Sequence, residues 1–334
     1  MRADLRTYYL GLPLKNPIVA SSGPLTGDLE SLQRLEQAGI AAVVLPSLFE
    51  EQISRDEQRI HSVYEYQAYS TAESLSFFPE IRDYNVGPRE YLQLIERAKR
   101  TVSVPVIASL NGSSPGGWAG FAKLFQDAGA DAIELNIYFV PTDPRMTAYD
   151  VESRYIELVA TVRDVVKIPV AVKIGAQFTN LPHFIGRLAS VGANGVVLFN
   201  RFLEPDIDLA TLQVTPQLVL SSRHELRLPL RWIAILRDQM AISLAATSGV
   251  HFPEDAIKLL LVGADVCMMT SALLKHGADY VGEMVEGIQT WLDVNGYESV
   301  DQLKGSMSYG NSPDSGQWER ANYMKAIVSY TAIH

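Results

Sequence analysis

The sequence predicts an α/β protein folded as one closed barrel of eight βα units, a (βα)8 or TIM barrel. Short apolar runs recur eight times, amphipathic stretches separate most of them, and a Gly-Ala-Asp junction or a near variant recurs between the two. The junctions are Gln37-Ala-Gly-Ile-Ala-Ala-Val-Val44, Asp127-Ala-Gly-Ala-Asp-Ala-Ile-Glu134, Ser190-Val-Gly-Ala-Asn-Gly-Val-Val197 and Leu261-Val-Gly-Ala-Asp-Val-Cys267. In each, glycine tolerates the positive φ at which a helix stops, and a strand follows at once.

The apolar runs are expected to form parallel strands. They are short, rich in β-branched residues and continuous rather than alternating, which is typical of strands covered on both faces. Proline stands at the entry of some, where no ladder hydrogen bond is required. The predicted strands are Pro17–Ser21, Ala41–Leu45, Val104–Leu110, Ala132–Ile137, Val170–Ile174, Gly195–Phe199, Ile242–Ala246 and Asp265–Met269.

Helices are expected between these strands. They include Asp28–Gln37, Pro88–Val102, Trp118–Ala128, Val151–Val166 and Pro253–Val262. Eight alternating units favour a closed barrel. A doubly wound open sheet is the alternative, but no Gly-x-Gly-x-x-Gly motif follows the first predicted strand.

The whole chain, residues 1–334, is expected to form a single domain with the barrel between about residues 14 and 295. In the C-terminal tail, residues 305–334, the segment Gly305–Gly316 is rich in Ser, Gly and Pro and is expected to be flexible. A helix is predicted after it, over Trp318–Val328.

Two long inserts interrupt the repeat, residues 46–87 after the second strand and residues 201–228 after the sixth. Segments of this length are usually functional lids or small accessory sheets. The first is rich in aromatic residues, which suit a subunit interface or a decorated surface equally well.

Composition excludes several classes of protein. A formal net charge of −10 argues against a nucleic-acid partner, although an acidic protein can still hold a positive pocket for a small anion. The single cysteine, Cys267, rules out a disulfide framework within this chain and fits a reducing compartment. No signal peptide or membrane-spanning run is visible, so a cytoplasmic location is expected.

The strand ends are where a barrel of this class carries its chemistry. In chain order they are Ser21-Ser22-Gly23, Pro46-Ser47, Asn111-Gly112, Asn136 with Tyr138 and Phe139, Lys173, Asn200-Arg201, Ser248-Gly249 and Thr270-Ser271. Small hydroxyl residues, glycines, asparagines and one lysine suit a small-molecule ligand that is planar, polar at its edges and anionic at one end.

Two of these features have specific interpretations. The turns at Ser248-Gly249 and Thr270-Ser271 follow strands seven and eight, whose loops often bind phosphate, although ordinary turn chemistry also explains them. Lys173 ends a very apolar strand, which is uncommon for a lysine without a partner. It could place a positive charge beside an electron-rich cofactor, act as a Schiff-base amine, or be a salt-bridged structural lysine.

Metal and hydrolytic sites are not predicted. The six histidines are dispersed, with no His-x-x-x-His or His-Glu-x-x-His spacing. No Gly-x-Ser-x-Gly nucleophile elbow is present either.

Four segments taken together resemble the dihydroorotate dehydrogenases. They are Leu14-Lys-Asn-Pro-Ile-Val-Ala-Ser-Ser-Gly23, Pro105-Val-Ile-Ala-Ser-Leu-Asn-Gly112, Ala128-Gly-Ala-Asp-Ala-Ile-Glu-Leu-Asn136 and Pro169-Val-Ala-Val-Lys-Ile174. The resemblance covers roughly residues 8 to 295 and is closest to the soluble class, since no N-terminal membrane helix is visible.

The resemblance implies an FMN-binding barrel. It identifies Lys173 with the family's flavin-contacting lysine, and Asn136 and Asn200 with asparagines that hold orotate. Ser74 is expected to replace another of those asparagines. The residues expected to contact FMN are Ala20, Ser21, Ser22, Gly23, Ser47, Asn111, Asn136, Lys173, Asn200, Ser248, Gly249, Thr270 and Ser271.

The departures from the family pattern fall where catalysis is expected. The family has a Cys or Ser base in the loop after the segment that ends at Asn136, and here Phe139 occupies that position beside Tyr138. Phenylalanine cannot accept a proton, and a tyrosine with an ordinary pKa of about 10 does so poorly. Ala246 and Thr270 stand at usual glycine positions of the phosphate turns, and Pro46 where many members have a lysine. The chain therefore resembles a divergent subgroup of this family.

Three functions are carried forward. The first is an FMN-dependent oxidoreductase of pyrimidine biosynthesis, or one acting on a related cyclic amide, with hydride passing to flavin N5. The second is an FMN-binding protein without dehydrogenase turnover, in a regulatory or scaffolding role. The third is a Schiff-base aldolase that uses Lys173. By analogy with the soluble class, a homodimer is expected.

Overall fold

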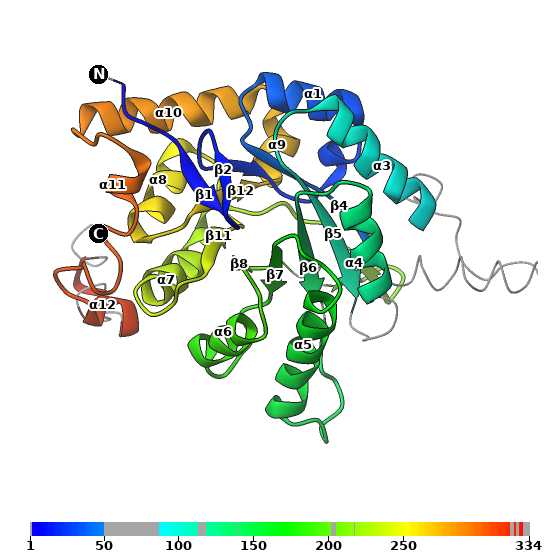
Figure 1. Ribbon diagram of the computed structural model, residues 1–334. Coiled ribbons are helices and arrows are strands. Elements are labelled where there is room, and N and C mark those ends of the chain that lie inside the picture. The colour runs from blue at the N-terminus through cyan, green and yellow to red at the C-terminus, as the bar shows by residue number, and fades with distance from the viewer. Residues whose placement is uncertain are drawn as a thin grey trace, which may run out of the picture.

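Eight parallel strands close into a barrel in the computed structural model of this protein, which confirms the predicted fold (Figure 1). The structure describes residues 2–49, 87–112, 118–137, 139–201, 205–216, 218–320, 324 and 327–329. The barrel strands are β3 (Ile18–Ala20), β4 (Ala42–Phe49), β5 (Val106–Gly112), β6 (Ala132–Ile137), β7 (Val170–Ile174), β8 (Gly195–Leu198), β11 (Ser243–Ala246) and β12 (Val266–Met269). β12 pairs with β3, so no barrel edge remains open.

Helices surround the barrel, as Figure 1 shows. They are α1 (Leu29–Gln37), α3 (Pro88–Thr101), α4 (Trp118–Asp127), α5 (Ala148–Arg163), α6 (Leu181–Ser190), α7 (Arg227–Arg237), α8 (Pro253–Val262), α9 (Ser271–His276) and α10 (Tyr280–Val294). Their apolar faces bury one core against the outside of the strands, and a second, smaller core fills the barrel. The predicted helix Val151–Val166 instead begins at Ala148, because Thr147 and Asp150 form a capping box.

The glycines of the four repeated junctions have the predicted backbone conformation. Gly39, Gly129, Gly192 and Gly263 have φ angles of 103°, 98°, 98° and 113°. Each follows a helix and precedes a barrel strand. The repeated sequence motif is therefore a helix-stopping turn, repeated around the barrel.

Two strands run further than the sequence predicts. β4 continues to Phe49 past a register shift between Val44 and Ser47, beside Pro46, which has no N–H to donate to the ladder. β5 continues to Gly112. Ser47 and Asn111, expected just beyond their strands, therefore lie within them.

A short hairpin closes the amino-terminal end of the barrel. Its strands are β1 (Thr7–Tyr9) and β2 (Leu12–Leu14), and Tyr9, Leu10 and Leu14 pack on the apolar residues inside the barrel. At Gly195 a Cβ atom would lie 2.5 Å from Leu10 Cδ2, so any larger residue where this plug meets β8 would displace the Leu10 side chain. The sequence did not predict the hairpin.

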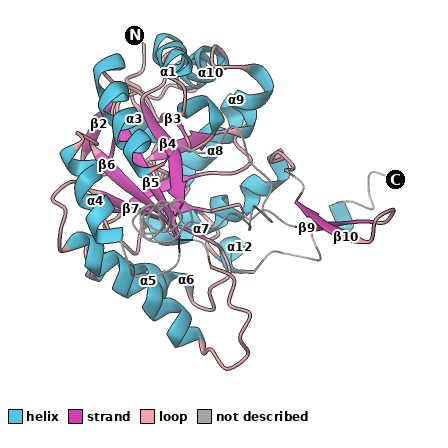
Figure 2. Ribbon diagram, turned by 90° about the vertical axis from the view of Figure 1, so that its right-hand side faces the viewer, coloured by secondary structure: helices cyan, strands magenta, loops and turns pink. Residues whose placement is uncertain are grey.

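The insert after the sixth barrel strand contains an accessory sheet, one of the two forms expected for it. β9 (Pro205–Asp208) and β10 (Gln213–Pro216) form an antiparallel pair that projects from the barrel (Figure 2). The chain then returns through the 3-10 helix η2 (Arg223–Leu226) to the barrel. The insert after β4 lies outside the described residues, apart from the end of β4 and Gly87.

The expectation that Gly305–Gly316 is flexible is wrong for its first half. After α11 (Val300–Leu303), backbone N–H groups of Gly305, Met307 and Tyr309 donate to Leu260, Leu261 and Ala234 at 3.0, 2.8 and 2.9 Å. These bonds attach the segment to α8 and α7, a tertiary contact that composition does not reveal. The predicted helix Trp318–Val328 overlaps α12 (Gly316–Glu319) and Ile327–Ser329 and lies partly outside the described residues.

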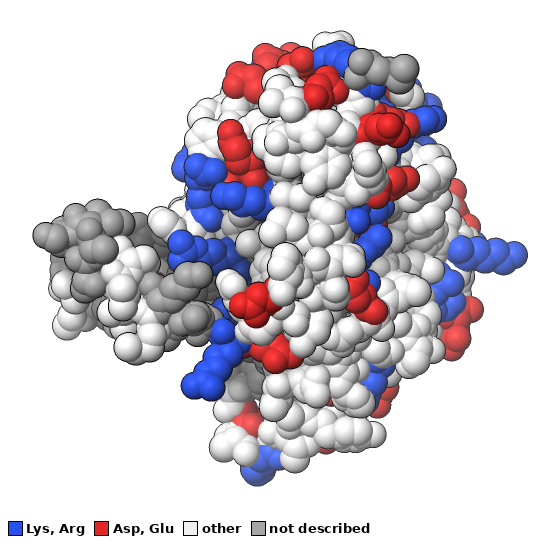
Figure 3. Space-filling model, turned by 90° about the vertical axis from the view of Figure 1, so that its left-hand side faces the viewer, with Lys and Arg blue, Asp and Glu red and all other residues white. Residues whose placement is uncertain are grey.

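Charged side chains of both signs are spread over the surface. On the face shown in Figure 3, Lys and Arg side chains are interspersed with Asp and Glu, and no single basic patch covers it. Within the described parts of the chain, no helix has the length and apolar character needed to cross a bilayer.

Candidate active site

A cavity of about 780 Å³ opens at the carboxyl ends of the barrel strands. This is the end at which (βα)8 enzymes carry their active sites, and the volume suits a small-molecule ligand. Nine predicted site residues line it: Ser21, Ser22, Gly23, Lys173, Asn200, Ser248, Gly249, Thr270 and Ser271. Barrel closure thus brings together residues that are dispersed over most of the sequence.

Lys173 lies in the floor of this cavity, on β7. Its side chain is only 9% exposed, and Nζ lies 3.5 Å from Glu134 Oε1 and 3.4 Å from Ser21 Oγ. The structure therefore supplies the partner that a lysine on a buried strand requires. Lys173 is also one of the residues that line the cavity, so its side chain lies within reach of a ligand there.

Glu134 is the residue that sequence reasoning overlooked. It is completely buried, and its Oε2 has no hydrogen-bond partner among the described residues. The available signal was a carboxylate in the middle of the apolar run of β6, two positions before Asn136 and therefore on the same face of the strand. That face points into the barrel, toward Lys173.

The predicted substrate-binding asparagines lie together. Asn200 Nδ2 donates to Asn136 Oδ1 at 2.7 Å, and Asn136 lies beside Lys173 in the register between β6 and β7. Asn200 lines the cavity, whereas Asn136 is not among its lining residues and reaches it through this bond. The two amides therefore form one hydrogen-bonded unit at the cavity wall.

Three other predicted cofactor residues lie beside the cavity and are not among its lining residues. Ala20 is buried at the end of β3. Ser47 Oγ forms a 2.8 Å hydrogen bond with Ser109 Oγ, and Asn111 is the register partner of Asn136. Ser47 and Asn111 therefore lie on the β4 and β5 side of the site, and Ala20 lies on its β3 side.

The turn after β11 has a conformation that suits an anion. Ser248 and Gly249 are successive residues with φ angles of 75° and 77°, and such turns can direct backbone N–H groups toward one point. A Cβ atom at Gly249 would lie 2.4 Å from the Leu226 backbone nitrogen, so no other residue fits without displacing the chain. The phosphate turn predicted here is therefore geometrically feasible.

Thr270, at a usual glycine position, packs against the loop after β3. Its Cγ2 lies 2.8 Å from where a Cβ atom of Gly23 would be, so Gly23 leaves the room that this threonine needs. The Thr270 hydroxyl donates to Ser22 O at 3.4 Å. Thr270 thus joins the turn after β12 to the loop after β3, and residues of both segments line the cavity.

Ser271 and Ser221 form a second polar group on the rim. Ser271 Oγ accepts a hydrogen bond from Ser221 N at 3.0 Å, and Ser221 Oγ lies 3.1 Å from His251 Nε2. Burial, and then the nearby charge of Lys275, lowers the pKa of His251. A neutral imidazole therefore supports the serine hydroxyls on this side of the cavity.

The returning insert supplies the outer wall. Arg201 and Glu225 both line the cavity and form an ion pair at 2.9 Å, and Arg201 also donates to Val219 O. Both side chains are about one-third exposed, so the pair is accessible to solvent. The Arg201–Glu225 pair therefore lies at the solvent-exposed entrance of the cavity, and Lys173 lies at its buried floor.

The residue at the predicted base position does not line the cavity. The Phe139 ring lies under the Arg154 guanidinium group of α5, with 4.9 Å between the guanidinium carbon and the ring centroid. Its neighbour Tyr138 and the predicted substrate residue Ser74 lie outside the described residues.

The donor set fits a flavin mononucleotide better than a metal ion. A buried cation in the floor, hydroxyl groups on two rims and a turn that only glycine fits would suit a polar ring with a phosphate tail. No cluster of three or more His, Cys, Asp or Glu residues that could hold a metal occurs in the described ranges.

The sequence pattern that defines the dihydroorotate dehydrogenase family matches residues 4–292. The B-type (NAD+) dihydroorotate dehydrogenase catalytic subunit of Methanosarcina acetivorans is 28% identical over 88% of this chain and 93% of that protein. The corresponding subunit of Pyrococcus abyssi is 26% identical over 90% of this chain and 98% of that protein. A putative A-type (fumarate) dihydroorotate dehydrogenase of Aeropyrum pernix is 28% identical over 66% of this chain and 73% of that protein.

Proposed function

The chain belongs to the dihydroorotate dehydrogenase family, and on that premise we propose that it is an FMN-dependent oxidoreductase that oxidises dihydroorotate or a related cyclic amide. One observation carries the proposal: an ammonium group, on Lys173, is held in the floor of a cavity whose rims are rich in hydroxyl groups. Such a cation stabilises the negative charge that a reduced flavin carries at its N1–C2=O edge.

The residues divide between the two ends of the cofactor. Ser248, Gly249, Thr270 and Ser271 would hold the phosphate. The residues from Ala20 to Gly23, with Lys173, would contact the ring, supported by Ser47 and Asn111 in the wall. When bound, FMN supplies a two-electron acceptor that takes hydride at N5.

The substrate half would be formed by the joined amides of Asn136 and Asn200, with Ser74 as the third polar group. Amide groups pair with the carboxylate and ring amides of a substrate such as dihydroorotate. Oxidation also requires removal of a proton, which Phe139 cannot accept, so this role falls to Tyr138 or another loop residue. Loss of a positioned general base typically costs about 10²–10⁴ in rate.

The position of Phe139 also supports a second candidate, an FMN-binding protein without dehydrogenase turnover. A ring packed under Arg154 is a structural contact and offers no proton acceptor. A Schiff-base aldolase is disfavoured by the contact of Lys173 Nζ with Glu134 Oε1 at 3.5 Å, because an amine held in an ion pair is a poor nucleophile.

The visible spectrum of the purified protein, followed by anaerobic addition of dihydroorotate, tests these candidates. A stoichiometric flavin band that bleaches rapidly supports the dehydrogenase. A flavin band that remains unbleached favours the binding protein. A colourless protein that gains no flavin band with added FMN contradicts both, and borohydride trapping of Lys173 with a carbonyl substrate would then favour the aldolase.

A further inference from the structure

Glu134 is a carboxylate placed inside the barrel at a cost. It is completely buried, its Oε1 lies 3.5 Å from Lys173 Nζ, and its Oε2 has no partner among the described residues. Buried polar atoms in folded proteins are nearly always hydrogen-bonded, so an exception of this kind requires an explanation. Stability alone does not provide one, because well-packed apolar residues often replace a buried ion pair without loss.

We propose that Glu134 is a positioning residue that keeps Lys173 a charged ammonium group at the cavity floor before and after flavin reduction. The inference rests on the proposed function, since it assigns Glu134 a role toward bound FMN. Without this carboxylate, burial would favour the neutral amine of Lys173. With the Glu134 carboxylate present, Lys173 already carries its positive charge before the flavin is reduced and gains a negative charge.

The other groups around the Lys173–Glu134 pair cannot replace Glu134. Ser21, from β3, offers only a neutral hydroxyl at 3.4 Å. Tyr9, from the plug, stays neutral because burial, then the charges of Glu134 and Asp265, raise its pKa well above the usual value. The charges of Arg201 and Glu225 at the entrance compensate each other. Among the described residues, Glu134 is the carboxylate within ion-pairing distance of Lys173.

The proton balance of flavin reduction follows from this assignment. When Lys173 is already charged, reduction of bound FMN would take up two electrons and one proton, at N5, and the charge of Lys173 would balance the remaining negative charge. When Lys173 is neutral in the oxidised state, the new negative charge also draws a proton onto Nζ. Reduction then takes up two protons for two electrons.

The pH dependence of the FMN midpoint potential measures this balance. For a two-electron couple the potential falls by about 30 mV per pH unit for each proton taken up. We expect a slope of about 30 mV per pH unit in the unmodified protein and about 60 mV in Glu134→Gln. A slope of about 30 mV in Glu134→Gln, or of about 60 mV in the unmodified protein, overturns the proposal.

Two variants serve as controls for the potential. Glu134→Asp keeps the charge, and its slope should remain at about 30 mV per pH unit. Glu152→Gln removes the carboxylate of a different ion pair, with Arg187 at 2.8 Å on α6, outside the site. Its slope should also stay at about 30 mV, and a change there would mean that the effect does not arise from Glu134.

A second measurement needs no flavin, so it separates failure of this inference from failure of the proposed function. Acetic anhydride acetylates neutral amines, and peptide mapping by mass spectrometry reports the rate at Lys173 in the protein freed of cofactor. We expect labelling at least about tenfold faster in Glu134→Gln than in the unmodified protein at the same pH. An equal rate overturns the inference even if the protein is yellow.

If Glu134→Gln does not fold, Glu134→Met takes its place, because it also removes the carboxylate and has a side chain of similar length. Faster labelling of Lys173 than in the unmodified protein then supports the inference, and an equal rate contradicts it. A colourless protein contradicts the proposed function, while the labelling result still tests the Glu134–Lys173 pair.

Discussion

The two ends of the barrel each bury a lysine against a carboxylate, but they differ in how completely the polar groups are paired. At the amino-terminal end, Lys304 contacts Asp265, Asp301 and the Thr7 hydroxyl at 3.1, 3.3 and 3.4 Å. At the carboxyl end, Lys173 contacts Glu134 and Ser21 at 3.5 and 3.4 Å. Lys304 lies in a network that is complete within the protein, and Lys173 lies beside a cavity.

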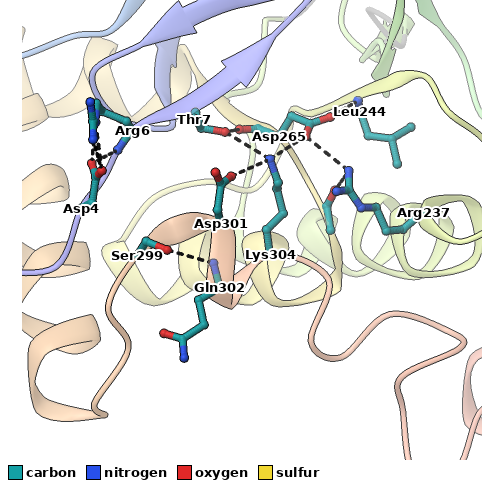
Figure 4. Close-up of polar contacts among 11 residues, drawn as sticks. Asp4, Arg6, Thr7, Arg237, Leu244, Asp265, Ser299, Asp301, Gln302 and Lys304 are labelled. Carbon is teal, nitrogen blue, oxygen red and sulfur yellow. Dashed lines mark hydrogen bonds and ion pairs between the residues drawn. The ribbon is translucent and has the colours of Figure 1, made fainter.

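Asp265 is the centre of the amino-terminal network (Figure 4). Its carboxylate accepts Leu244 N at 2.8 Å and Arg237 Nη1 at 3.3 Å besides Lys304, and its backbone oxygen accepts the Thr7 hydroxyl at 3.1 Å. The network joins the N-terminal plug, strands β11 and β12 and the C-terminal segment. Because every buried charge in this network has a partner of opposite charge or a hydrogen bond, the network can stabilise the fold.

The carboxyl end lacks that completeness. Glu134 Oε2 has no partner among the described residues, and Lys173 and the rim serines face the cavity. The difference between the ends fits a structural role for the first network and the ligand-binding role proposed above for the second. Four predictions test this comparison.

The largest effect is expected at the amino-terminal end, for Asp265→Asn. The substitution leaves Lys304 and Arg237 without their buried carboxylate and should lower the free energy of unfolding by about 3–5 kcal/mol. Urea denaturation followed by circular dichroism measures it. Asp301→Asn is the control, because its side chain is 62% exposed and it should cost less than about 1 kcal/mol. Similar losses in both variants would contradict the role of Asp265.

Gly249→Ala should have the next largest effect. The new methyl group would lie 2.4 Å from Leu226 N at a φ of 77°, so strain and overpacking together should cost about 2–4 kcal/mol and weaken FMN binding. Gly296→Ala is a matched control with a φ of 75° and open space around the added atom. If both variants lose the same stability and FMN affinity, the turn at Gly249 has no special packing role.

Lys173→Met tests the paired charge at the carboxyl end. The substitution leaves Glu134 buried without a cation and should cost about 1–3 kcal/mol, less than Asp265→Asn because the site borders a cavity. The double variant Lys173→Met/Glu134→Gln should recover most of this loss in the same denaturation experiment. A double variant that is less stable than Lys173→Met would show that Glu134 stabilises the barrel independently of Lys173.

The smallest effect concerns His251 and pH. Its pKa is lowered in the folded protein by burial, so the unfolded chain binds more protons as the pH falls through about 6.5. Stability should therefore decrease by less than about 1 kcal/mol between pH 7 and pH 5 because of this residue. Denaturation of His251→Asn should show a smaller decrease over the same range, and an unchanged pH dependence would exclude this contribution.

Much of the fold was predictable because its signals are local. The glycine junctions and apolar runs specify helix ends and strands through neighbouring residues, and all eight predicted barrel strands are present. The boundaries of β4 and β5 were wrong because strand extension depends on pairing with the adjacent strand. The plug formed by β1 and β2 and the bound segment after Gly305 were missed because only tertiary contacts stabilise them.

The candidate site was also predictable in part: its location was, but the packing of some of its side chains was not. A barrel directs all its strand ends to one mouth, so the sequence indicated that Lys173, Asn200 and the serine and glycine turns would meet there. It did not indicate that Phe139 would pack under Arg154, because side-chain direction beyond a strand end depends on the neighbouring helix.

The sequence by itself determined the barrel, the end at which its cavity opens and the position of Lys173, because these follow from periodicity and strand order. Tertiary structure alone decided which carboxylate each buried lysine meets. Glu134 lies 39 positions from Lys173, and Asp265 lies 39 positions from Lys304. Those pairs depend on strand register and barrel closure, and no local pattern in the sequence encodes them.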